Sequence, residues 1–227
     1  MKASRAHCGF ALALLLSGCA SPVAAPTYMA FPANDGITVS AASYGHGDKA
    51  IVLVPGAHGV GETWDIQAKR LARSGFRVLA LDFRGLGRSP VEHQDSDQLR
   101  YEILSAVRRM RAEGARQVFV VGASFGGSSA AEAALMAPGE IDRLVLLADG
   151  GFQGSEKLTG RKLFIVAADD KDGSGRKRLE DIRRRFEAAS EPKTLVVLQG
   201  AAHAQFIFLG PERERLYREI ERFLLAP

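Results

Sequence analysis

Ser124 stands in a pattern that can build a reactive serine. The segment Gly122-Ala-Ser-Phe-Gly126 follows an apolar run at 117–121 and precedes a segment of small residues at 127–136. Glycines on both sides of a serine remove the Cβ atoms that would clash where a strand passes closely into a helix, so the serine can occupy a strained turn and expose its hydroxyl. The pattern predicts that Ser124 is a nucleophile. A plain glycine-rich turn with a serine N-cap is the alternative, and a phosphate-binding turn fits less well because no Gly-Lys-Ser/Thr follows.

A serine nucleophile requires a base, and His203 is the best placed histidine. It is one of five histidines and follows the last expected strand, in a loop of small residues at 200–206. His58 follows a buried run in a segment better suited to supply backbone amides. We therefore expect His203 to take the serine proton, with an exposed loop histidine as the alternative.

Several carboxylates could orient that histidine. Asp169, Asp170 and Asp172 follow the apolar run 162–167, and Asp149 follows the preceding run. A carboxylate after a strand is often only a turn residue or a helix cap. We expect Asp170 to be the acid, with Asp149 as its rival.

The elements that must position these residues alternate between buried strands and amphipathic helices. Strands are expected at 37–44 (an antiparallel edge strand), 50–54, 77–83, 117–121, 142–148, 162–167 and 194–199, and helices at 62–74, 95–113, 127–136, 176–189 and 211–225. Runs that are apolar at every position are typical of strands covered on both faces. The expected fold class is therefore α/β, a single domain with a mostly parallel sheet and helices on both faces. Sites on such sheets lie at the carboxyl ends of the strands.

Four motifs make the chain resemble the α/β-hydrolase fold family over about residues 35–225. They are V-L-V-P-G-A-H-G at 52–59, D-F-R-G-L-G-R-S at 82–89, G-A-S-F-G-G at 122–127, and A-A-D-D at 167–170 together with G-A-A-H at 200–203. The chain departs from the family pattern at Pro55, where a histidine is usual, and at Ala167, where a glycine is usual before the acid.

The resemblance implies a serine hydrolase acting on small-molecule carboxylic esters or thioesters through an acyl-enzyme. Ser124, Asp170 and His203 would form the catalytic triad, and the backbone N–H groups of Ala57 and Phe125 would form the oxyanion hole. Neither a cofactor nor a metal ion would be needed. Amide cleavage stays open, because the same triad serves amides. The alternative is a non-catalytic envelope lipoprotein that uses the fold as a binding or scaffold module.

The segment after the strand at 142–148 has no room for the helical lid that many members of this family carry. Only residues 149–161 separate that strand from the next. The sequence therefore predicts a fold without a helical lid and an open site flanked by Phe152. An open cleft suits a small acyl group, or a bulky substrate held by one end.

The beginning of the chain resembles a bacterial lipoprotein signal. Lys2 and Arg5 precede a short apolar run, and Leu16-Ser-Gly-Cys19 resembles the lipobox, in which the cysteine becomes lipidated. We expect a signal peptide at 1–18, lipidated Cys19 with a proline-containing flexible tether at 19–34, and the hydrolase domain at 35–227. Ala20 rather than an aspartate follows the cysteine, which resembles the outer-membrane sorting pattern of Gram-negative lipoproteins. This resemblance implies a location in the cell envelope, on the periplasmic face of the outer membrane, with the lipid as the membrane contact.

Charge and cysteine content limit the other function classes. Loss of Lys2 and Arg5 with the signal lowers the formal charge from +4 to +2, and acids are interspersed among the basic residues of the last helices. This mixture is typical of solvated helix faces, so no nucleic-acid partner is expected. Cys8 leaves with the signal, so the folded body has no thiol for a disulfide or a metal site.

Overall fold

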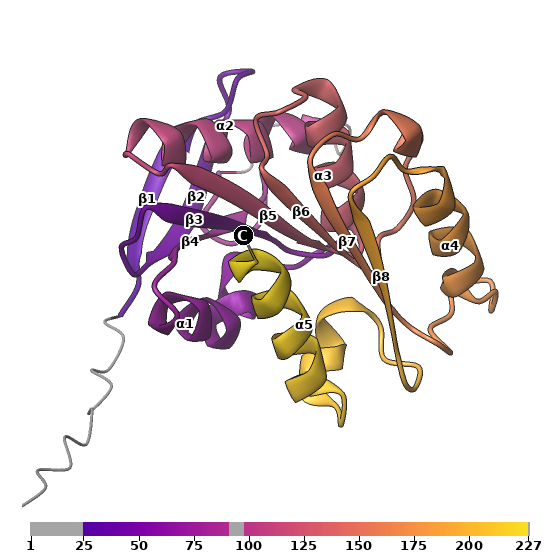
Figure 1. Cartoon of the computed structure of the whole chain (residues 1–227). Coiled ribbons are helices and arrows are strands. Elements are labelled where there is room, and N and C mark those ends of the chain that lie inside the picture. Colours follow the sequence, from indigo (N-terminus) through magenta and orange to yellow (C-terminus); the bar gives the residue numbers. More distant parts are fainter. Residues whose placement is uncertain (1–24, 91–97, 227) are drawn as a thin grey trace, which may run out of the picture.

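The strands of this computed structural model, which describes residues 25–90 and 98–226, form one eight-stranded sheet (Figure 1). The strands are β1 (Thr27–Pro32), β2 (Thr38–Tyr44), β3 (Lys49–Val54), β4 (Arg77–Asp82), β5 (Gln117–Ala123), β6 (Arg143–Leu147), β7 (Arg161–Ala167) and β8 (Lys193–Leu198). Their spatial order is β1-β2-β4-β3-β5-β6-β7-β8. From β4 to β8 neighbouring strands are parallel, and β1 and β2 add an antiparallel edge. The predicted single-domain, mostly parallel α/β sheet is confirmed.

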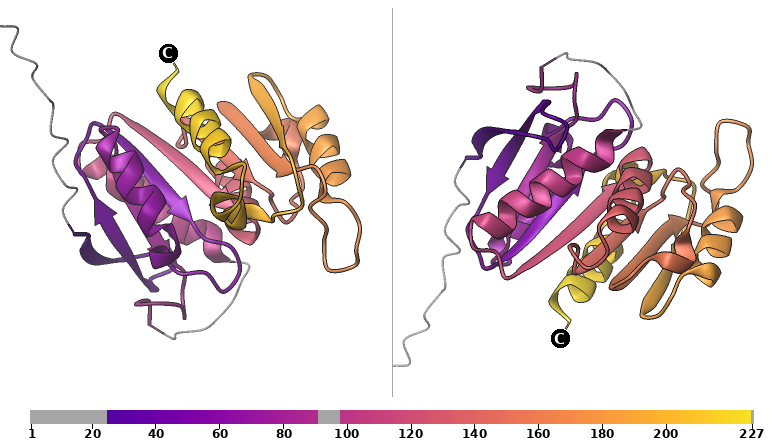
Figure 2. Two further views of the ribbon diagram at one scale, coloured as in Figure 1. Left: turned by 90° about the horizontal axis from the view of Figure 1, so that it is seen from below. Right: turned by 90° about the horizontal axis from the view of Figure 1, so that it is seen from above.

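Helices cover both faces of the sheet, as the all-apolar central strands require. The α-helices are α1 (Asp65–Arg73), α2 (Leu99–Ala112), α3 (Phe125–Met136), α4 (Arg178–Ala188) and α5 (Arg213–Leu225), and the 3-10 helices are η1 (Gly61–Trp64), η3 (Ser155–Lys157) and η4 (Ala204–Leu209). The two panels of Figure 2 look onto the two faces of the sheet, with α1 and α5 in front of one face and α2 and α3 in front of the other. The helix α4 shares the hydrophobic core of α2 and α3. Within the described residues, no helix is long and apolar enough to cross a membrane.

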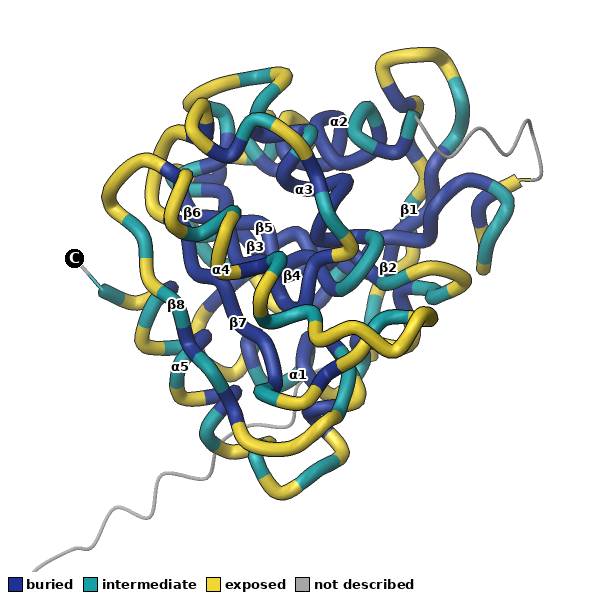
Figure 3. The backbone as a smooth tube through the Cα atoms, turned by 90° about the vertical axis from the view of Figure 1, so that its right-hand side faces the viewer, coloured by how far each residue is buried: buried dark blue, intermediate teal, exposed yellow. Residues whose placement is uncertain are grey.

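Two hydrophobic cores result, one on each face. One contains buried side chains of α2, α3 and α4, and the other contains those of α1, η4 and α5. Central strands are dark blue in the burial view of Figure 3. Trp64 is 1% exposed and packs edge-on against Phe208 of η4, with ring centroids 6.0 Å apart. Truncating a buried tryptophan to alanine typically lowers the free energy of unfolding by about 3–5 kcal/mol. The packing of Trp64 therefore stabilises the position of η4 beside the start of α1.

The structure corrects the sequence prediction at the N-terminal edge of the sheet. Residues 19–34 were expected to form a flexible tether, but Thr27–Pro32 is strand β1 and pairs along its whole length with β2. The strand predicted at 37–44 is therefore antiparallel but not at the edge. Pro26 precedes β1 and Pro32 is its last residue. Proline is tolerated at these positions because β1 is an edge strand. Only Phe31 is fully buried in β1, so the sequence pattern there is weak.

The remaining elements agree with the predicted order. The helix expected at 62–74 begins as η1 and continues as α1, and the helix expected at 95–113 is described from Leu99 onward. Between β6 and β7 the described chain forms turns and η3, which is three residues long. Within this connection, all of which is described, the longest helical segment is therefore the three residues of η3.

Candidate active site

Ser124 lies in a sharp turn between β5 and α3. Its backbone has φ 51° and ψ −120°, in a region that non-glycine residues rarely occupy. A Cβ on Gly126 would lie 2.1 Å from the Pro55 carbonyl oxygen, and a Cβ on Gly122 would lie 2.6 Å from the Gly126 carbonyl oxygen. Only glycine fits at these two positions. Hydrogen bonds from the Gly127 and Gly150 amides to the Ser124 carbonyl hold the turn in place.

The structure brings Ser124, His203 and Asp170 together from three separate loops. The Ser124 Oγ lies 2.8 Å from His203 Nε2, and His203 Nδ1 lies 2.8 Å from Asp170 Oδ2. The Asp170 side chain is 1% exposed, whereas that of His203 is 29% exposed. An ionised carboxylate only accepts hydrogen bonds, so it favours the tautomer with the proton on Nδ1. The Nε2 atom is then free to accept the serine proton.

Asp149, the rival acid, has a different partner. Its Oδ1 lies 2.7 Å from Arg185 Nη2 and accepts a hydrogen bond from the Gly151 amide at 3.2 Å. The side chain is fully buried, and burial raises the pKa of Asp149 although Arg185 acts in the opposite direction. Its position faces α4 and not His203. The geometry therefore favours Asp170 as the carboxylate that orients the imidazole.

The two amides predicted to form an oxyanion hole lie at the carboxyl ends of β3 and β5. Among the hydrogen bonds between described residues, none uses the N–H of Ala57 or of Phe125. Phe125 is the first residue of α3, so its N–H lies at the positive end of a helix dipole. Neither N–H group is therefore occupied by another described residue.

A groove of about 530 Å³ opens beside Ser124 and His203. Its other lining residues come from the loop after β3, from η1 and α1, and from the η4 segment. The exposed apolar side chains of Ile66, Phe206 and Leu209 lie along it. Phe152 does not line this groove, contrary to the sequence expectation. It is 8% exposed, packs in the core on the other face of the sheet, and lies under the Arg185 guanidinium.

Gln205 is a candidate functional residue that the sequence reasoning missed. Its Oε1 accepts a hydrogen bond from the Gly56 amide at 3.4 Å, and its Nε2 donates to Thr63 Oγ1 at 3.1 Å. Gln205 therefore connects the loop that carries His203 to the loop that carries Ala57. A clue in the sequence was its position two residues after His203, but its partners lie far away in the chain.

Asp82 organises the loop after β4. Its Oδ1 accepts from the Gly61 amide at 2.6 Å and its Oδ2 from the Arg88 amide at 2.9 Å. Gly87 has φ +56°, and a Cβ there would lie 2.5 Å from the Asp82 carboxyl carbon. The D-F-R-G-L-G-R-S motif at 82–89 is therefore explained by the packing of this loop beside η1.

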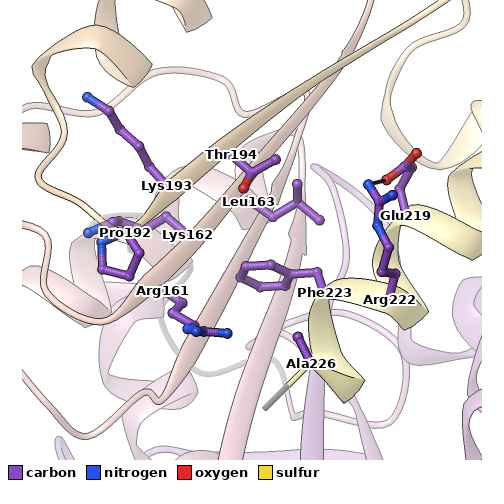
Figure 4. A pocket seen from close by; sticks show the side chains of 10 residues that line it. All are labelled: Arg161, Lys162, Leu163, Pro192, Lys193, Thr194, Glu219, Arg222, Phe223 and Ala226. Carbon is purple, nitrogen blue, oxygen red and sulfur yellow. Dashed lines mark hydrogen bonds and ion pairs between the residues drawn. The ribbon is translucent and has the colours of Figure 1, made fainter.

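A second hollow, of about 310 Å³, lies at the amino ends of β7 and β8 (Figure 4). It is lined by Arg161, Lys162, Leu163, Pro192, Lys193, Thr194, Glu219, Arg222, Phe223 and Ala226. In parallel strands the amino ends lie at the opposite edge from the carboxyl ends, so this hollow is remote from Ser124. Within the described part of the chain, no cluster of three or more His, Cys, Asp or Glu side chains could hold a metal ion.

Comparison with known proteins agrees with this geometry. A family model described as alpha/beta hydrolase fold matches residues 49–156. The human serine hydrolase BPHL is 35% identical over 117 residues, which cover 50% of this chain and 40% of that protein. The esterase Rv0045c of Mycobacterium tuberculosis is 36% identical over 133 residues, covering 57% of this chain and 43% of that protein. The chain thus matches about two fifths of the length of these relatives.

A solved structure shows the same fold at low sequence identity. The Pyrococcus furiosus esterase Pf2001 superimposes with a TM-score of 0.73 at 16% identity, over 88% of this chain and 93% of that chain. This likeness concerns the fold alone. From the sheet order, the serine turn and these matches, we conclude that the chain is a protein of the α/β-hydrolase fold, similar in sequence to serine hydrolases and esterases.

Proposed function

We propose that the protein is a serine hydrolase that cleaves carboxylic esters or thioesters through an acyl-enzyme. The observation that carries this proposal is the pair of 2.8 Å contacts that join Ser124 to His203 and His203 to Asp170. Ser124 is held in a strained turn and borders an open groove, as an attacking hydroxyl requires. The similarity to proteins named esterase and serine hydrolase supports the same activity.

The reaction follows from the roles that this geometry allows. Ser124 Oγ attacks the acyl carbonyl carbon while His203 Nε2 takes its proton. The carbonyl oxygen becomes negatively charged and is stabilised by the N–H groups of Ala57 and Phe125, each of which would lower the barrier by about 3 kcal/mol. His203 then protonates the departing alcohol or thiol, and the acyl group remains on Ser124. A water molecule that gives its proton to His203 finally releases the acid.

A fluorophosphonate probe tests the nucleophile directly. We expect covalent labelling at Ser124, located by peptide mass spectrometry, together with hydrolysis of short p-nitrophenyl esters. Ser124→Ala and His203→Ala should each lower kcat by at least about 10⁴-fold, because these groups act as a unit. Ser74→Ala, which changes an exposed serine after α1, is the matched control and should leave both readouts unchanged. Absence of both labelling and hydrolysis would favour the non-catalytic scaffold.

We further propose that Cys19 carries a lipid that anchors the protein to the cell envelope. Cys19 and the signal at 1–18 lie outside the described residues, so the proposal rests on the Leu16-Ser-Gly-Cys19 motif. Expressed in a Gram-negative host with an alkyne fatty acid, the wild-type protein should become labelled and fractionate with the outer membrane. Cys19→Ser should abolish the labelling, whereas Cys8→Ser should not.

A further inference from the structure

Exposed apolar side chains gather at one place on the surface, beside Ser124. Of the six large hydrophobic residues that are exposed among the described ones, three line the groove next to this serine. Ile66 of α1 is 68% exposed, and Phe206 and Leu209 of η4 are 66% and 77% exposed. Clustered exposed apolar residues mark binding surfaces, whereas single ones are ordinary.

The backbone and packing of η4 explain why these side chains face outward. Within η4, Ile207 and Phe208 are 2% and 4% exposed and face the core, so their neighbours Phe206 and Leu209 project to the opposite side. Phe208 is fixed by its contacts with Trp64 and Tyr217. The apolar wall is therefore carried by a rigidly packed helix and does not depend on a flexible loop.

The charges in the groove select against an anionic ligand. No Lys or Arg belongs to its described lining, whereas Glu62 and Asp65 do. Glu62 pairs with Arg88 at 2.9 Å, and Asp65 pairs with Lys69 at 2.8 Å and accepts from the Tyr44 hydroxyl at 3.2 Å. The described lining therefore offers no lysine or arginine to bind a ligand carboxylate or phosphate, and the two carboxylates that it contains are already paired with cations outside the lining.

We propose that this groove binds an uncharged hydrocarbon chain attached to the scissile ester, and that Ile66, Phe206 and Leu209 determine the preference for chain length. The inference rests on the proposed hydrolase function, since Ser124 and His203 border the same groove. A volume of about 530 Å³ is within the usual range for a small-molecule site. The chain belongs to either the acyl or the alcohol half of the ester, and the experiment below separates the two.

The test measures kcat/KM of the purified full-length protein on two substrate series. In the first, p-nitrophenyl esters run from acetate to octanoate. In the second, alkyl acetates run from methyl to octyl. In the series whose chain enters the groove, kcat/KM should rise up to about fourfold per added methylene until the groove is filled. If the acyl series is the one that responds, p-nitrophenyl hemisuccinate, whose acyl chain ends in a carboxylate, should be a poorer substrate than the butyrate.

Variants connect the effect to the three side chains. Ile66→Ala, Phe206→Ala and Leu209→Ala should each lower the ratio of kcat/KM for the six-carbon chain to that for the shortest one by about three- to tenfold. Because all three side chains are largely exposed, we expect the variants to fold. Leu225→Ala, an exposed leucine outside the groove, is the matched control and should leave the ratio unchanged.

Two failures are distinguishable. If esters are cleaved but the ratio is the same in wild type and all three variants, the groove proposal is wrong and the hydrolase proposal stands. If no ester is cleaved and the fluorophosphonate probe does not label Ser124, the proposed function itself fails, and the groove inference falls with it.

Discussion

At the scale of single residues, Asp149 and Asp170 show how two buried carboxylates acquire different roles. Both follow neighbouring strands and both are about 1% exposed. Asp170 faces His203, while Asp149 faces Arg185 and leaves its Oδ2 without a partner among the described residues. The distinction depends on which loop lies opposite each carboxylate, so the sequence alone left both candidates open.

Substituting each of these aspartates should separate catalysis from stability. We expect Asp170→Asn to lower kcat up to about 10⁴-fold, because an asparagine amide can impose the wrong imidazole tautomer. Asp149→Asn should leave kcat within about threefold, but lower the free energy of unfolding by about 2 kcal/mol through the weakened contact with Arg185. Ester hydrolysis and urea denaturation measure the two effects. A large loss of kcat in Asp149→Asn with full activity in Asp170→Asn would reverse the assignment.

At the scale of elements, the sequence predicted those strands that are apolar at every position and those helices with a clear apolar face. β3 and β5 are examples, since each has consecutive residues with almost no exposure. β1 was missed because burial there falls almost entirely on Phe31, and flanking prolines are equally typical of a tether. Phe152 was misplaced because the path of a loop depends on tertiary packing against Arg185, which no local pattern encodes.

The connection between the loops after β3 and β8 yields a prediction at this scale. Gln205→Leu removes the hydrogen bonds to the Gly56 amide and to Thr63 while keeping a similar size. The loop that carries Ala57 should then lose its orientation, lowering kcat about tenfold with little change in KM, since an oxyanion donor acts in the transition state. Steady-state kinetics on p-nitrophenyl butyrate measures this split.

The conservative variants show whether Gln205 is a positioning residue. Gln205→Glu keeps an acceptor for the Gly56 amide and should recover most of kcat, and Thr63→Val, which removes only the other partner, should have a smaller effect than Gln205→Leu. A fall in melting temperature with unchanged kcat would instead assign Gln205 a purely structural role.

At the scale of the whole molecule, β1 completes the sheet at its N-terminal edge. It covers β2 along six paired positions, buries Phe31 to 5% exposure, and places the Tyr28 ring 3.5 Å from the Arg88 guanidinium. Without β1, the backbone groups of β2 would form an open edge that can pair with another chain. Among the described residues, the sheet therefore extends to Thr27, and the predicted domain boundary at residue 35 lies too late in the chain.

Two truncations test this boundary. A chain that begins at residue 25 keeps β1 and should unfold at the same urea concentration as the full chain. A chain that begins at residue 33 lacks β1 and should lose about 2–4 kcal/mol of unfolding free energy, chiefly from the exposed core around Phe31. It should also self-associate through β2, measurable by light scattering. Because Ser124 lies several strands away from this edge, the fraction that stays folded should still react with the fluorophosphonate probe. Equal stability of both truncated chains would show that β1 contributes nothing to the core and would restore the tether as the correct description of residues 27–32.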